Sequence, residues 1–243
     1  MEIPNTYESC CMQEVMGDTL RPGGFELTDF AVNYCALSPR DSALDLGCGR
    51  GATVNYLQEK YSIEAIGVDP SEKLIGEAEK SFGGASFVRA KGEDLPFDDE
   101  SFNCVLAECT LSLMDADIAI EQVHRVLKKN GWFVISDVYA KHPEAADELR
   151  SFSLNSCMRG LHDMEKLKNK LEKAGFSIAY VEDCSHLLKE LLVKIVFSYG
   201  SMCEFWNTAS ENCVSGDGFY RVLKQCKPGY FLLIVKKRGT ADE

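Results

Sequence analysis

Glycines stand at alternate positions near residue 45, directly after a short run typical of a buried strand. Residues 43–52 read ALDLGCGRGA, in which Asp45 precedes Gly47, Gly49 and Gly51. Alternating glycines let a strand turn sharply into a helix while the backbone closes on a ligand. A turn that binds phosphate has no need of a carboxylate here, whereas a ligand that carries a cation does. The motif therefore predicts a site for a ligand with a positively charged group.

Strand and helix patterns alternate along the chain around this turn. Strands are predicted at 42–46, 63–68, 85–89, 102–108 and 132–138, and helices at 52–60, 71–81 and 117–128. Ser71 is typical of a helix N-cap, and Asn130-Gly131 of a helix end. Repeated strand–helix units with buried strands predict a parallel sheet with helices on both faces.

The remaining segments predict two more strands and a cap. Strands are expected at 176–182 and 230–236, and helices at 26–37, 144–157, 162–174 and 187–206. We expect one domain over 1–243, with an N-terminal cap at 1–40, a core at 41–138, and cap insertions at 139–161 and 185–228.

Four stretches carry motifs at spacings that fit successive strand–helix units. They are residues 45–51 (DLGCGRG), 66–71 (IGVDPS), 92–97 (GEDLPF) and 125–131 (RVLKKNG). Together they resemble the class I S-adenosylmethionine (SAM)-dependent methyltransferases, of the type 11 group. In the last stretch Lys129-Asn130 stand where Pro-Gly is common in this family. The similarity covers 41–138 well and 162–236 in the order of elements. It implies an α/β, Rossmann-like fold: a seven-stranded, mostly parallel sheet with helices on both faces and a helical cap.

The resemblance also implies a cofactor, SAM, with S-adenosylhomocysteine as the product. Asp45 would accept from the ammonium group of SAM, Asp69 from the ribose hydroxyls and Asp94 from the adenine amino group. Arg21, in an Arg-Pro-Gly-Gly turn, either reaches the SAM carboxylate or braces the turn. No metal ligand is implied. The implied binding residues are Asp45, Gly47, Gly49, Gly51, Asp69, Pro70, Leu74, Glu93, Asp94, Leu95 and Glu108.

A nicotinamide dehydrogenase is the main competing class, because a fold alone does not determine function. Its fingerprint is G-x-G-x-x-G, which leaves room for a pyrophosphate. Here the spacing is G-x-G-x-G, and Asp45 would repel a pyrophosphate and attract an ammonium group. The sequence therefore favours SAM.

The methyl acceptor leaves a weaker trace in the sequence. Transfer from a sulfonium needs a general base only when the acceptor must lose a proton. The acceptor should lie beyond the carboxyl ends of the strands. The catalytic candidates there are Glu108, Tyr139, Cys157 and His162. We expect a small-molecule acceptor; a SAM-binding interaction module without catalysis is the alternative from another class.

Cysteines raise a further alternative, a thiol-dependent metalloid methyltransferase. Residues 132–176 are similar to arsenite methyltransferases, in which a cysteine matching Cys157 helps to hold the metalloid. Soft thiolates select soft metals and metalloids. Cys10, Cys11 and Cys109 are the residues that could join Cys157 near the pocket mouth. Reduced, separately packed thiols are the alternative.

Composition limits the partners and the compartment. The 243 residues carry a net charge of −12, a field that repels nucleic acid and anionic membranes. No window of eighteen uninterrupted apolar residues occurs, and the first residues lack the pattern of a signal peptide. The 11 cysteines form no CxxC pair. We therefore expect a cytoplasmic protein with free thiols and no nucleic-acid or membrane partner. A homodimer through the apolar helix 187–206 remains open.

Overall fold

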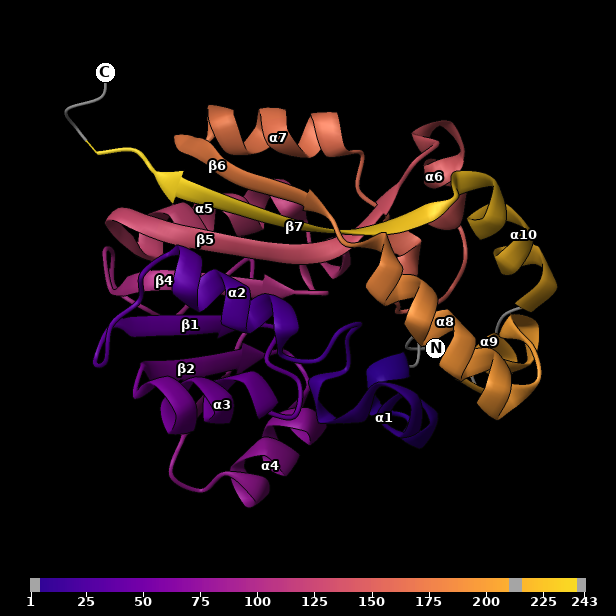
Figure 1. Cartoon of the computed structure of the whole chain (residues 1–243), viewed down its shortest axis with the longest axis horizontal. Coiled ribbons are helices and arrows are strands. Elements are labelled where there is room, and N and C mark those ends of the chain that lie inside the picture. Colours follow the sequence, from indigo (N-terminus) through magenta and orange to yellow (C-terminus); the bar gives the residue numbers. More distant parts are fainter. Residues whose placement is uncertain (1–4, 210–215, 240–243) are drawn as a thin grey trace.

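A twisted sheet of seven strands runs through the centre of the molecule (Figure 1). The computed structural model describes residues 5–209 and 216–239. The strand order is β3-β2-β1-β4-β5-β7-β6, and only β7 runs antiparallel to its neighbours. The predicted seven-stranded, mostly parallel sheet is confirmed. The strands are β1 (Ser42–Leu46), β2 (Glu64–Asp69), β3 (Ser86–Arg89), β4 (Phe102–Glu108), β5 (Leu127–Ala140), β6 (Phe176–Asp183) and β7 (Pro228–Lys237).

Helices cover both faces of this sheet because side chains along each strand alternate between two buried clusters. Ala43 and Leu106 pack on one face, with residues of α2 (Glu26–Tyr34) and α3 (Ala52–Tyr61). Leu44 and Val105 pack on the other face, with residues of α5 (Ala116–Val126) and α7 (Met164–Lys173). The helix α4 (Glu72–Ser81) contacts β2 and β3, and begins at Ser71, whose hydroxyl accepts from the Leu74 N–H.

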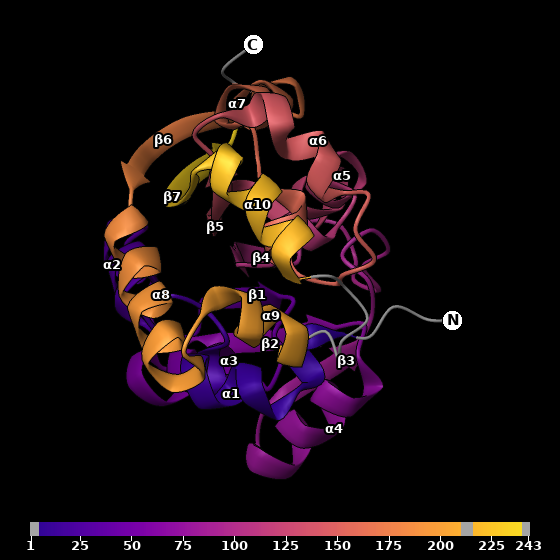
Figure 2. The same cartoon turned by 90° about the vertical axis from the view of Figure 1, so that its right-hand side faces the viewer.

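A cap of helices lies beyond the carboxyl ends of the parallel strands (Figure 1). Figure 2, which faces this side, shows α8, α9 and α10 gathered there. The cap helices are α1 (Cys10–Met16), α6 (Ala146–Leu149), α8 (Ser185–Tyr199), α9 (Met202–Ala209) and α10 (Gly216–Cys226). Within the described ranges, none of the helices is long and apolar enough to cross a membrane.

The predicted helix 117–128 is too long at its C-terminus. The helix α5 ends at Val126 and β5 begins at Leu127, so the predicted turn at Asn130-Gly131 lies within the strand. Leu127 pairs with Phe102 of β4, and the Lys128 ammonium donates to Asn103 Oδ1 at 2.8 Å. Pairing with β4 therefore overrides the local helical pattern.

Three other predicted helices are also corrected. The predicted helix 187–206 is two helices, α8 and α9, because the chain breaks at Gly200 with a φ of 77°. The segment 144–157 is mostly irregular and contains the four-residue α6. The helix predicted from residue 162 begins at Met164, since the Asp163 carboxylate caps it by accepting from two backbone N–H groups.

Candidate functional site

A cavity of about 290 Å³ opens at the carboxyl ends of β1, β2 and β4. Its position follows from the topology, because the connections after the neighbouring strands β1 and β4 lead to helices on opposite faces of the sheet. Most of the predicted binding residues line it: Asp45, Gly47, Gly49, Asp69, Pro70, Leu74, Glu93 and Glu108.

The glycine turn adopts a backbone that side chains would disturb. Gly47 has a φ of 82°, and a Cβ atom there would lie 2.5 Å from Thr110 Cγ2. Gly51 has a φ of 80°, and its Cβ would lie 2.5 Å from the ring of Phe87. Gly51 is outside the cavity lining, so packing and conformation explain it without a ligand.

Asp69 ties the glycine turn to the end of β2. Its Oδ2 accepts from the Gly49 N–H at 3.0 Å, and its Oδ1 accepts from the Ser71 N–H at 2.8 Å. Burial raises the pKa of Asp69, while these two backbone donors act in the opposite direction. Each carboxylate oxygen can still accept a second hydrogen bond from a ligand hydroxyl.

Asp45 carries a buried carboxylate that no hydrogen bond from the described residues reaches. Burial, followed by repulsion from Glu108 and Asp69, raises the pKa of Asp45 to about 8, although Arg21 partly opposes this. A buried carboxylate without a partner is costly. A cation placed in the cavity beside Asp45 would therefore be strongly favoured.

Arg21 and Glu108 form a buried ion pair beside Asp45. Their Nη2 and Oε2 atoms are 2.9 Å apart, and both side chains are almost fully buried. Thr28 accepts from Arg21 and donates to Glu108, and Thr53 accepts from Arg21. The Arg21 Nε atom is buried without a partner. Sequence analysis missed both threonines, because neither belongs to a motif.

Two of the predicted adenine contacts lie elsewhere. The backbone of Asp94 bridges to Lys91, and its side chain is exposed and outside the cavity lining. Leu95 is buried in the core cluster on the face of the sheet that α5 and α7 cover. Glu93 lines the cavity, and its carboxylate accepts from the Asp115 N–H at 2.9 Å.

Tyr139 and His162 are outside the cavity lining. The His162 Nε2 atom lies 3.3 Å from Oδ2 of Asp137, which is fully buried and also accepts from the Ser112 N–H and hydroxyl. The Tyr139 ring packs against Gly229 and Phe231 of β7. Both side chains have evident packing partners in the fold.

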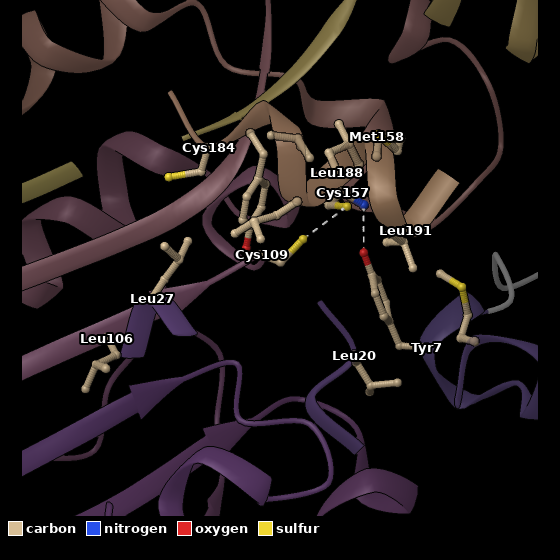
Figure 3. Packing of buried hydrophobic residues seen from close by; sticks show 14 of the residues in the cluster. Tyr7, Leu20, Leu27, Leu106, Cys109, Cys157, Met158, Cys184, Leu188 and Leu191 are labelled. Atoms are coloured by element: carbon tan, nitrogen blue, oxygen red, sulfur yellow. Dashed lines mark hydrogen bonds between the residues drawn. The ribbon is translucent and has the colours of Figure 1, made fainter. Parts of the chain in front are cut away.

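Cys157 lies behind the cavity lining, in contact with Cys109. Figure 3 shows their sulfur atoms pointing toward each other, 3.5 Å apart, with the Cys157 N–H donating to the Tyr7 hydroxyl. Cys109 and Tyr7 line the cavity. The hydrogen bond with Cys157, and then burial, raise the pKa of Cys109; burial is the main cause that raises the pKa of Tyr7.

The other two thiols of the metalloid alternative do not join this pair. Cys10 is exposed, and Cys11 lies 3.2 Å from the Ser9 hydroxyl. Over 5–209 and 216–239, no group of three or more His, Cys, Asp or Glu side chains is arranged to hold a metal ion.

Comparison with known proteins identifies the family. Residues 44–135 match a family model described as a methyltransferase domain. The chain is 30% identical over 160 residues to the uncharacterized methyltransferase YodH of Bacillus subtilis, which covers 64% of this chain and 68% of YodH.

Two further relatives are longer proteins. Phosphoethanolamine N-methyltransferase 1 of Zea mays is 32% identical over 190 residues, covering 75% of this chain and 37% of the relative. An arsenite methyltransferase of Halobacterium salinarum is 29% identical over 152 residues, covering 59% of this chain and 39% of the relative. The chain thus spans less than half of each of these two proteins.

The fold has counterparts among solved structures. The [4+2]-cyclase SpnF superimposes with a TM-score of 0.76 at 21% identity, covering 98% of each chain. This likeness concerns the fold alone, and the sequence matches supply the family. The motif at 45–51, the family model and the similarity to YodH agree. The chain belongs to the class I SAM-dependent methyltransferases.

Proposed function

We propose that this protein transfers a methyl group from SAM to a small-molecule acceptor and releases S-adenosylhomocysteine. The observation that carries the proposal is the Asp45 carboxylate, buried in the cavity with no hydrogen-bond partner among the described residues and with a pKa raised to about 8. The ammonium group of SAM supplies the cation that this carboxylate lacks.

The remaining polar groups of the cavity fit the rest of SAM. Asp69 has acceptor capacity left for the ribose hydroxyls, and Pro70 and Leu74 offer apolar surface beside it. Arg21, whose Nε has no partner, is the candidate for the carboxylate of the amino-acid part. When bound, SAM supplies an activated methyl group on a sulfonium, a good leaving group.

The part of this chain in the reaction is then to position the reactants and exclude water, rather than to move a proton. The raised pKa values of Cys109 and Tyr7 keep both groups protonated at neutral pH. Glu108 is held by Arg21 and two threonines. These cavity residues suit an acceptor that has a free lone pair, because such an acceptor needs no general base.

The entrance to the cavity favours a small acceptor. Asn5, Tyr7 and Asn155 line the cavity, and the Thr6 hydroxyl donates to the Asn155 carbonyl at 2.6 Å, which joins the N-terminal segment to the loop before Cys157. The relative from Zea mays is named an N-methyltransferase, and an amine that enters the cavity in its neutral form has the free lone pair that is required.

Calorimetry with S-adenosylhomocysteine tests the central claim. We expect binding by the wild type, weaker binding by Asp45→Asn, and no change for Asp98→Asn in the exposed turn before β4. Absence of binding at millimolar ligand would refute the proposal, and binding of NAD instead would point to a nicotinamide enzyme. Release of S-adenosylhomocysteine in a screen of pooled amines then separates an enzyme from a non-catalytic SAM-binding module.

A metalloid acceptor is the second candidate, because Cys109 lines the cavity with its thiol facing that of Cys157, and a relative is named an arsenite methyltransferase. One equivalent of arsenite should protect Cys109 and Cys157 from alkylation in the reduced protein. Cys157→Ser should lose this protection, whereas Cys104→Ser, altered within β4, should keep it. Equal alkylation with and without arsenite removes this candidate.

A cytoplasmic location remains part of the proposal. None of the cysteines in the described ranges forms a disulfide, as expected for a protein in a reducing compartment. Fractionation of cells that express the tagged protein checks this expectation. Sedimentation of the purified protein checks whether it forms a homodimer.

A further inference from the structure

A second hollow lies on the cap, in the region where α8, α9 and α10 gather in Figure 2. It has a volume of about 640 Å³, which is within the usual range for small-molecule sites. Leu192 and Val193 of α8, Trp206 of α9 and Leu223 of α10 contribute to its walls. The cavity that holds Asp45 has a different set of lining residues, so the two are separate.

The α8 wall of this groove exposes a row of large apolar side chains. Val193, Val196 and Phe197 are 54%, 44% and 87% exposed, and all three line the groove. Their spacing of three and four residues places them on one face of the helix. A contiguous apolar patch of this kind marks a binding surface in a soluble protein.

Three lysines give the groove a charged end. Lys189, Lys224 and Lys227 line it and are exposed, and their ammonium groups form no ion pair with the residues that the structure describes. Lys189 lies one turn into α8, while Lys224 and Lys227 lie where α10 ends. The start of α8 is joined to β7, the strand that follows α10, because the Tyr230 N–H donates to the Ser185 hydroxyl. The net charge of the chain is −12, so this end of the groove differs in sign from the protein as a whole.

The groove therefore has a positive end beside the sheet and an apolar path that follows α8 away from it. Lys189 and Phe197 are eight residues apart on one helix, a distance of about 12 Å, which suits an extended chain of roughly ten carbons.

We propose that this groove binds a single-chain amphiphile with an anionic head group. The carboxylate or phosphate of the ligand would lie between Lys189, Lys224 and Lys227, and its alkyl chain would run along α8 toward Phe197. The site requires no methyl donor, so it can be tested independently of methyl transfer.

Trp206 provides the signal for this test. The protein has two tryptophans, and Trp132→Phe leaves Trp206 in the groove wall as the only one. In this background, decanoate should change the fluorescence saturably. We expect decanoate to bind at least tenfold more tightly than decanol and at least a hundredfold more tightly than butyrate. Equal affinities for decanoate and decanol would overturn the proposal, because the lysines would then have no role.

Matched variants locate the ligand. Lys224→Glu should weaken decanoate binding at least fivefold and leave decanol binding unchanged, whereas Lys80→Glu on α4 should change neither. Val193→Asp should abolish both, and Ile118→Asp on α5, at a side chain that is 44% exposed against 54% for Val193, should not. Wild-type affinity in Val193→Asp would refute the site.

Other occupants give different results. A wild-type dimer that Val193→Asp converts to a monomer would assign the groove to a second copy. Pelleting with anionic phospholipid vesicles, without binding of free decanoate, would assign it to a membrane surface. Either result overturns the proposal.

Discussion

Arg21 Nη2 lies 2.9 Å from Glu108 Oε2, and the side chains of both residues are almost completely buried, at 5% and 2% exposure. This ion pair joins the N-terminal segment to the end of β4, at the wall of the cavity that Asp45 lines. Asp45 also interacts with the charge of Arg21, so two carboxylates, Asp45 and Glu108, share one guanidinium. The charge balance of the cavity therefore depends on Arg21.

Removal of Arg21 should destabilise the protein strongly. Arg21→Ala leaves Glu108 buried without its cation, so we expect a loss of about 3 kcal/mol in the free energy of unfolding, measured by urea denaturation. Arg89→Ala is the control, because its ion pair with Glu72 is exposed and should contribute less than about 0.5 kcal/mol. A similarly small loss in the free energy of unfolding of both variants would show that the buried pair does not stabilise the fold more than an exposed one.

Asp45 should make the stability depend on pH. Its pKa is raised from an ordinary acidic value to about 8 in the folded protein, so the folded state retains a proton that the unfolded state has lost. Stability should therefore fall as pH rises from about 4 to about 8. Asp45→Asn removes this effect and should be more stable than wild type by about 2 kcal/mol or more at pH 8, with a smaller difference at pH 5. A difference that is independent of pH would contradict this assignment.

Binding of S-adenosylhomocysteine should release a proton from Asp45. At pH 7 the free carboxyl is mostly protonated, and the ammonium group of the ligand favours the ionised form, so affinity should increase toward pH 8. Calorimetry in two buffers with different ionisation enthalpies measures the release, expected to approach about one proton per site. Asp45→Asn should release less. Equal proton release by the two proteins would place the titrating group elsewhere.

Asp69 and Asp94 should differ in their importance for the adenosine part of the ligand. Asp69→Ala loses hydrogen bonds that hold the glycine turn and accept from the ligand, so S-adenosylhomocysteine affinity should fall by about 1–3 kcal/mol. Asp94→Ala alters an exposed side chain outside the cavity lining and should change affinity by less than about 0.5 kcal/mol. A large effect of Asp94→Ala would restore the adenine role that the sequence suggested.

Cys109 and Cys157 lie close enough to be cross-linked by a mild oxidant. Their sulfur atoms are 3.5 Å apart, and a disulfide requires an approach to about 2 Å. Diamide would take two electrons and two protons from the thiols and be reduced to the hydrazine. Mass spectrometry of a non-reduced digest should then identify a peptide linked through these two residues. Recovery of both peptides unlinked after oxidation would show that the pair cannot close.

The sequence predicted the strands and the donor motif because these depend on local patterns. The glycines and the carboxylate of residues 45–51 indicated a turn at the end of a buried strand. The strands β1 and β4 have the predicted bounds. The cap was predicted less well. The early end of α5 depends on the pairing of Leu127 with the distant Phe102, which a helical period does not reveal. The break at Gly200 is local, at a glycine with a φ of 77°, but the apolar period continues across it.

The sequence by itself determined the fold class and the methyl donor, since each follows from residues that lie close together in the chain. Only the tertiary structure decided which side chains share the cavity. It joins Arg21 to Glu108 and Cys109 to Cys157, pairs separated by dozens of residues, and it turns Asp94 outward. The physical reason is that burial and charge pairing arise between segments brought together by the folded sheet, so neither can be read from the order of residues.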